Sequence, residues 1–213
     1  LALSTAELDI AAFINDWATA FFSVDYANSE AGQLGPEDQL YLSRGFLTIG
    51  NLNQNPFYVT VGKNYTPFGR YSTNMITPTA TNQLGRILST IAEVGYANDN
   101  GLFASAFAYN GEQSISNNDA VKQGGGEIGM RQDDSQYPYE IGVSIISNLA
   151  DSQGMNDTGG DTFGGFGSNY SLAHRVPAVD AYGIVSVGSF TFINEYVTAT
   201  RAFDSTNLAF NSE

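Results

Sequence analysis

Apolar and polar residues alternate with a period of two through most of the chain, a pattern typical of β-strands. The stretch 90–109, TIAEVGYANDNGLFASAFAY, shows the unit that recurs. In its first half Ala92, Val94 and Tyr96 fall on one face, and the residues between them fall on the other. Its centre, Asn-Asp-Asn at 98–100, predicts a tight turn, because Asn and Asp tolerate the left-handed backbone that such turns need. The stretch therefore predicts two antiparallel strands joined as a hairpin.

The same alternation predicts about ten strands in one domain over residues 1–213. The expected strands are 6–14, 17–26, 41–49, 57–64, the two halves of 90–109, 125–131, 139–145, 179–187 and 190–201. Short and long connections alternate between them: the short ones are 15–16, 51–56, 98–100, 132–138 and 188–189, and the long ones are 27–39, 66–86, 110–124 and 150–177. Outer-membrane barrels have short turns at one end and long loops at the other. The sequence therefore predicts an all-β, antiparallel up-and-down transmembrane β-barrel, either complete or part of a larger one.

The composition agrees with this prediction and excludes some other classes. Charged residues make up 14% of the chain, whereas soluble domains average about 25%. Acidic residues outnumber basic ones by 22 to 8, which argues against a nucleic-acid partner, because phosphates attract Lys and Arg. The chain has no cysteine, so disulfides and Cys-ligated metals are excluded. No apolar run reaches the roughly 18 residues that a transmembrane helix needs.

Charges within the expected strands fall mostly opposite the apolar face. In a barrel the apolar face would meet outer-membrane lipid, where an Arg or Lys at the midplane costs about 2–4 kcal/mol. The opposite face would line the lumen, and its candidate residues are Glu7, Asp9, Asp25, Arg44, Glu93, Glu127, Arg131, Glu140, Glu195 and Arg201. Lys63, Asp180 and Arg86 fit this segregation less well. The alternative is the solvent face of a soluble antiparallel sheet, which gives the same alternation.

The connection 66–86 is the candidate constriction of such a lumen. It is irregular, contains Pro and Gly, and has no run of charges. If it folds inward, Arg70 and Arg86 would face acidic lumen residues and create a transverse field that orients a charged solute.

Patterns for catalysis or metal binding are weak. His174 is the single histidine, and we expect it to be a surface residue rather than a catalytic base, so no enzymatic activity is predicted. An esterase-like barrel enzyme built around His174 is the lower-ranked alternative. The acidic, Gly-rich stretch 151–161 lacks EF-hand spacing, and a solvated loop is the simpler interpretation than calcium binding. No cofactor and no metal site are expected.

Several segments resemble a known family. The segments 46–69, FLTIGNLNQNPFYVTVGKNYTPFG, and 87–111, ILSTIAEVGYANDNGLFASAFAYNG, resemble the siderophore-porin family of outer-membrane barrels, the legiobactin-uptake type. The stretches 3–26 and 178–204 are also similar to it. The resemblance implies a protein of the bacterial outer membrane that passes an iron–siderophore complex or a similar small solute. It carries over no residue-level binding motif.

Two departures from that family concern the extent of the chain. Members are longer, and this chain ends in Phe210-Asn-Ser-Glu213 rather than in a strand with a terminal aromatic residue. A barrel must close so that no strand edge faces lipid. We therefore expect a piece of a larger barrel, or a part that pairs with other copies as a homo-oligomer. The alternative function is a secreted or surface β-sheet protein that binds ligands or self-assembles through its strand edges.

Overall fold

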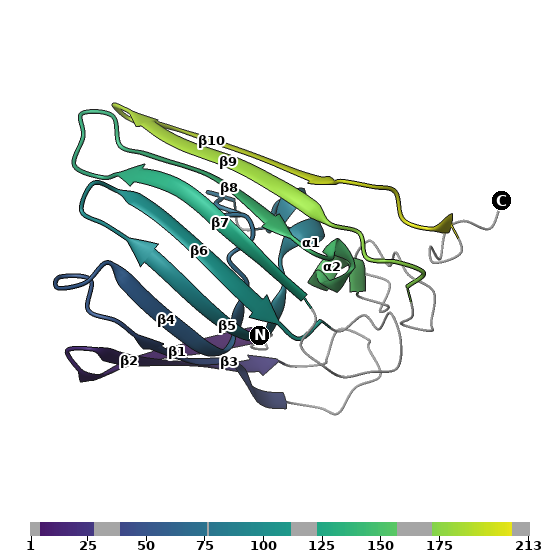
Figure 1. Ribbon diagram of the computed structural model, residues 1–213, viewed down its shortest axis with the longest axis horizontal. Coiled ribbons are helices and arrows are strands. Elements are labelled where there is room, and N and C mark those ends of the chain that lie inside the picture. The colour runs from purple at the N-terminus through teal and green to yellow at the C-terminus, as the bar shows by residue number, and fades with distance from the viewer. Residues whose placement is uncertain (1–4, 28–38, 76, 112–122, 157–171, 206–213) are drawn as a thin grey trace, which may run out of the picture.

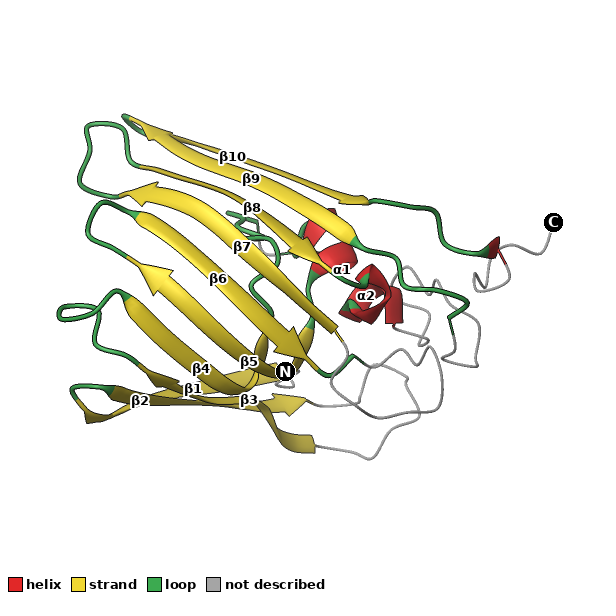
Figure 2. Ribbon diagram, in the orientation of Figure 1, coloured by secondary structure: helices red, strands yellow, loops and turns green. Residues whose placement is uncertain are grey.

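The computed structural model describes residues 5–27, 39–75, 77–111, 123–156 and 172–205. Its ten strands are β1 (Thr5–Asn15), β2 (Ala18–Ala27), β3 (Gln39–Ile49), β4 (Phe57–Tyr65), β5 (Leu88–Ala97), β6 (Leu102–Tyr109), β7 (Gln123–Gln132), β8 (Tyr139–Ile146), β9 (Ala178–Val187) and β10 (Phe190–Ala199). Three short helical segments accompany them in the described residues: α1 (Ala80–Gly85), η1 (Leu149–Asp151) and α2 (Gln153–Asn156) (Figure 2). The all-β prediction is confirmed, and none of the described helices is long and apolar enough to span a membrane.

The expected strands are all present, and their ends agree within a residue or two. The last strand was predicted to run to residue 201, but β10 ends at Ala199, so Arg201 lies outside the sheet and is exposed. The prediction of an irregular 66–86 is wrong for residues 80–85, which form α1. Thr79 begins this helix because its side-chain oxygen accepts a hydrogen bond from the Asn82 amide at 3.1 Å.

One antiparallel sheet contains every strand, in the order in which the strands follow one another along the chain. Each strand pairs with the next, from β1 with β2 to β9 with β10. Figure 1 shows that the sheet is curved, so that β1, β2 and β3 lie at an angle to β6 to β9. β1 and β10 lie on opposite sides of the molecule and are the two edges of the described sheet (Figure 1).

Connections of different length lie at opposite ends of this sheet. The turns within the hairpins are short, such as the one after β5 in which Gly101 has a positive φ of 85°. Figure 1 shows these turns together at the left, and because consecutive strands are antiparallel, the strand ends joined by the longer connections lie at the other end. The expected loops 27–39, 110–124 and 150–177 fall partly outside the described residues, whereas 66–86 is described except for residue 76.

The two faces of the sheet differ in what covers them. In β5, Ser89, Ile91 and Glu93 are buried, while the residues between them are exposed. We call the buried side the inner face, and the segment 66–86 packs on it through hydrogen bonds to β8 and β10. We call the opposite side the outer face.

An apolar core occupies the inner face at the end where the long connections lie. Its buried members include Phe68 from the segment 66–86 and Tyr109 at the end of β6, both with no exposed surface. The remaining members are Ile87, Ile91, Phe107, Ile146, Leu149 and Ala178. The phenol of Tyr109 donates to Asp151 at 3.2 Å, and Asn148 donates to the same carboxylate oxygen at 3.1 Å. The acidic stretch that begins at Asp151 thus starts with a structural acceptor, and its residues from 157 to 161 lie outside the described part.

Candidate functional site on the inner face of the sheet

Aromatic rings lie over glycines of neighbouring strands on the inner face. Tyr58 pairs with Gly95 across β4 and β5, and Tyr182 pairs with Gly142 across β8 and β9. A Cβ atom at either glycine would collide with the partner ring, so the missing side chain is what lets the ring lie flat. Two phenylalanine rings use glycines of β7 in the same way, in the pairs Phe103–Gly129 and Phe107–Gly125.

The hydroxyl groups of these tyrosines reach carboxylates of the inner face, of which Glu93 is buried and Glu127 is half-buried. Tyr58 donates to Glu93 at 3.0 Å, and Tyr182 donates to Glu127 at 2.9 Å. Glu93 is only 7% exposed, so its carboxylate is held by a neutral donor inside the protein rather than by water. The two predicted lumen residues are therefore parts of a cross-strand tyrosine–glycine–glutamate arrangement.

Glu195 of β10 fastens the segment 66–86 to the sheet. One of its carboxylate oxygens accepts the backbone amides of Arg70 at 2.7 Å and of Tyr71 at 2.8 Å. The other accepts the hydroxyl of Thr81 at 3.0 Å. On β8, Ser144 accepts the amide of Gly69 at 2.9 Å. A segment that follows β4 is thus attached to strands on the far side of the sheet.

The two arginines of the candidate constriction have different surroundings. The guanidinium of Arg70 pairs with Glu140 at 2.8 Å, and its side chain remains 48% exposed. Arg86 instead lies over the ring of Tyr65, 3.6 Å from its centroid. In the described residues only Arg70 of these two forms an ion pair with a carboxylate of the inner face. The part of Arg86 in a transverse field stays a prediction, and the contact that the structure shows for its guanidinium is the ring of Tyr65.

Asp180 and the hydroxyl group of Tyr71 are buried polar groups that the sequence prediction did not include. Asp180 lies on β9 with no exposed surface, and neither of its carboxylate oxygens has a hydrogen-bond partner among the described residues. The hydroxyl of Tyr71 is also buried without a partner there. Burial raises the pKa of the Tyr71 phenol, and the charges of Asp180 and Glu195 raise it further. Tyr71 has a φ of 50°, a left-handed conformation that a tyrosine adopts only where its surroundings impose it.

A second group of charges lies on β1 to β3. The guanidinium of Arg44 contacts Glu7 at 2.8 Å and Asp9 at 3.2 Å. The pairing of β2 with β3 shifts at Ser23, which leaves Ser43 without an opposite residue. Because of this bulge, the consecutive residues Ser43 and Arg44 both contact carboxylates of the inner face, and the hydroxyl group of Ser43 donates to Asp25 at 3.0 Å. The side chains of Glu7 and Asp9 are 53% and 49% exposed, far more than the carboxylates of β5 and β9.

The remaining candidates are placed as follows. Arg131 is on β7 and contacts Asp133 at 3.4 Å and Glu140 at 4.0 Å. Lys63 lies on the outer face near the end of β4, where its ammonium group reaches the Leu42 carbonyl at 3.5 Å. His174 contacts the carbonyl oxygen of Ala202 at 3.2 Å. No group of acidic or histidine side chains suited to a metal ion occurs in the described residues.

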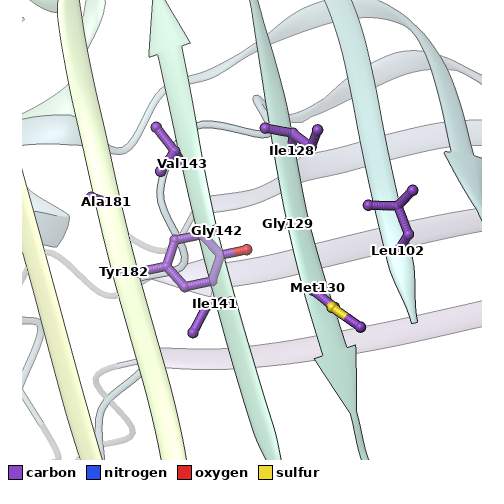
Figure 3. A pocket seen from close by; sticks show the side chains of 9 residues that line it. All are labelled: Leu102, Ile128, Gly129, Met130, Ile141, Gly142, Val143, Ala181 and Tyr182. Carbon is purple, nitrogen blue, oxygen red and sulfur yellow. The ribbon is translucent and has the colours of Figure 1, made fainter. Parts of the chain in front are cut away.

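The outer face is apolar and carries a hollow on β7 and β8. Ile141, Val143 and Ile145 of β8 are 48%, 47% and 56% exposed, whereas the intervening Ser144 is 1% exposed. Two adjacent glycines, Gly129 and Gly142, form the floor of a hollow of about 360 Å³ on β7 and β8. Figure 3 shows side chains around these glycines, namely Leu102, Ile128, Met130, Ile141 and Val143.

Sequence comparison finds relatives but no described activity. No protein-family model matches the chain. A UPF0422 protein from Coxiella burnetii (strain RSA 493 / Nine Mile phase I) is 36% identical over 211 residues, which are 97% of this chain and 43% of that protein. A UPF0422 protein from Legionella pneumophila (strain Paris) is 33% identical over 225 residues, covering 100% of this chain and 42% of the relative. The chain thus spans less than half the length of these curated relatives.

Proposed function

We propose that the chain is part of an outer-membrane porin, a transmembrane β-barrel that lets a small solute cross the bacterial outer membrane. The single observation that carries this proposal is the inverted polarity of the sheet. Ile145 is 56% exposed on the outer face, while Asp180 and Glu93 are 0% and 7% exposed on the inner face. A soluble sheet gains stability by burying its apolar side, at about 25 cal/mol per Å² of apolar surface. Lipid is the surrounding that suits an exposed apolar face of this extent.

The distribution of charge supports the same proposal. Lys63 is the one charged residue on the outer face of the described strands, and it lies near a strand end, where a long side chain reaches polar surroundings. Strands of 8 to 11 residues suit a tilted crossing of the hydrocarbon core. Short and long connections alternate between consecutive antiparallel strands, so they join opposite ends of the sheet, as in outer-membrane barrels.

Closure of the barrel is part of the proposal. Unpaired edges are not tolerated in lipid, so β1 and β10 need partners. The curated relatives are more than twice as long as the region they share with this chain. We infer that strands outside these 213 residues, from a longer chain or a second copy, complete the barrel. The resemblance to siderophore porins suggests an iron–siderophore complex as the solute.

The alternative is a secreted or surface sheet that self-assembles, and the two unpaired edges favour it. Extraction from membranes separates the two proposals. A barrel is expected to require detergent and to migrate differently on a denaturing gel before and after heating. A protein that dissolves in plain buffer and shows no heat-dependent shift would refute the barrel and favour the self-assembling sheet.

A pair of variants tests the lipid-facing role of the outer face. Val143→Arg places a charge in the middle of β8 and is expected to destabilise the membrane-inserted sheet by about 2–4 kcal/mol. The form whose gel migration changes on heating should therefore be lost from the outer membrane. Asp134→Arg puts the same side chain in the exposed turn that follows β7, and should leave assembly unchanged. Equal assembly of both variants would contradict the lipid-facing assignment.

A further inference from the structure

The charges of the inner face do not balance. Its carboxylates are Glu7, Asp9, Asp25, Glu93, Glu127, Glu140, Asp180 and Glu195, and its arginines are Arg44 and Arg131 together with Arg70 and Arg86 from the segment 66–86. Three of these arginines have carboxylate partners, namely Glu7 and Asp9 for Arg44 and Glu140 for Arg70 and Arg131, whereas Arg86 lies over the ring of Tyr65. The carboxylates of the inner face thus outnumber its arginines, and an excess of negative groups remains.

The unmatched carboxylates are held by neutral donors. Glu93 and Glu127 receive tyrosine hydroxyl groups, and Glu195 receives backbone amides and a threonine hydroxyl. A neutral donor fixes the position of a carboxylate without cancelling its charge. In the described residues no ion pair joins these three side chains to an arginine or lysine.

Asp180 is an independent indication that the region takes a positive group. It has no exposed surface, and both of its carboxylate oxygens lack a donor among the described residues. A buried carboxylate without a donor is costly unless a positive group or a proton neutralises it. Its neighbours Glu127 and Glu195 are acidic as well, and among the described residues no ion pair joins Asp180 to an arginine or lysine.

We propose that the inner face makes the pore selective for cations and for positively charged solutes. Carboxylates that line a pore favour cations, because low-dielectric walls focus their field onto the water path. This inference rests on the proposed pore. If the wall lowers the energy of a monovalent cation by about one kT and raises that of an anion equally, the permeability ratio is about sevenfold.

Reversal potentials across planar bilayers test the inference. The full chain, extracted in detergent and inserted into the bilayer, is placed in a KCl gradient. We expect a potassium-to-chloride permeability ratio of about sevenfold. The double variant Glu127→Gln, Asp180→Asn should reduce that ratio at least about twofold, because it removes two wall charges. The control Asp99→Asn, Asp134→Asn removes the same charge from exposed turns and should leave the ratio unchanged.

The outcomes distinguish the two levels of the proposal. Conductance with a preference for chloride, or with no preference, overturns cation selectivity and leaves the pore intact. A protein that assembles in membranes yet never conducts overturns the pore and the selectivity together. If the double variant fails to assemble, Glu127→Gln alone replaces it, since its amide oxygen can still accept the Tyr182 hydroxyl. An unchanged ratio in that variant also counts against the proposal.

Discussion

Replacing Gly142 by alanine tests whether the tyrosine–glycine pairs of the inner face stabilise the sheet. A Cβ at this position would lie 2.5 Å from both Cζ and Oη of Tyr182, a separation that real Cβ contacts essentially never show. The neighbouring strand prevents the backbone from moving far, so the ring must leave its place over β8. The ring then also loses its 2.9 Å hydrogen bond to Glu127.

The size of the effect follows from these two losses. Overpacking a buried site costs about 1–3 kcal/mol, and a lost hydrogen bond to a charged group costs about 1.5–3 kcal/mol. We therefore expect Gly142→Ala to lower the free energy of unfolding by about 2.5–6 kcal/mol. Gly183 is the matched control, because a Cβ there would meet nothing closer than Ile141 Cγ2 at 3.8 Å. Gly183→Ala should be neutral or slightly stabilising, since alanine restricts the unfolded chain more than glycine does.

The assay is urea unfolding in detergent, with the free energy taken from the midpoint at constant m-value. A double-mutant cycle with Tyr182→Ala isolates the contact, because Gly142→Ala should cost less than about 0.5 kcal/mol once the ring is absent. Two results would refute the reasoning. One is an equal midpoint for the alanine variants at Gly142 and Gly183. The other is an undiminished cost at Gly142 in the Tyr182→Ala background.

Three further predictions concern the attachment of the segment 66–86 and the contribution of individual contacts to stability. Glu195→Ala should release the segment 66–86 from β10, so trypsin should cleave after Arg70 at least about tenfold faster, as followed by mass spectrometry. A tenfold faster cleavage corresponds to a free energy of local opening that is lower by about 1.4 kcal/mol. Asp151→Ala should destabilise the protein by about 1–3 kcal/mol in urea unfolding, because Tyr109 and Asn148 lose their shared acceptor. Glu7→Gln should change the same free energy by less than about 1 kcal/mol, because its contact with Arg44 is exposed to solvent.

Strand positions could be predicted from the sequence because apolar and polar residues alternate within each strand, and this pattern depends only on neighbouring residues. The alternation in β5 places Val94 and Glu93 on opposite faces, and a one-residue shift would exchange them. The sequence suggested that the segment 66–86 folds inward, but the strands to which it is attached could not be predicted in this way. This attachment depends on Ser144 and Glu195, whose bonds to the segment join residues separated by 75 and 125 positions in the chain. The N-cap at Thr79 was a local signal for α1, and it was missed because six residues carry no clear helical period.

Register explains why the residues of the candidate site were found but their arrangement was not. Glu93 and Glu127 were identified from alternation alone, yet their tyrosine donors come from other strands, Tyr58 from the adjacent β4 and Tyr182 from β9, on the far side of β8. The glycine beneath each ring looks in the sequence like a weak point of a strand. Only the pairing of Tyr58 with Gly95 and of Tyr182 with Gly142 gives these glycines a role. Asp180 fits the alternation of the sequence less well, whereas the pairing of β8 with β9 places it opposite Ser144 on the inner face.

The uneven filling of the inner face restricts where a solute could pass through the proposed barrel. Phe68 and Tyr109 are completely buried, so the side of the inner face next to β6 and β8 is filled by the chain itself at the end with the long connections. On β1, by contrast, the side chains of Glu7 and Asp9 are 53% and 49% exposed. Charges deep in the filled region act on a solute only through their field, whereas those on β1 can contact it. The water path of the proposed pore therefore belongs along β1 to β3, with the segment 66–86 and Arg70 as its opposite wall.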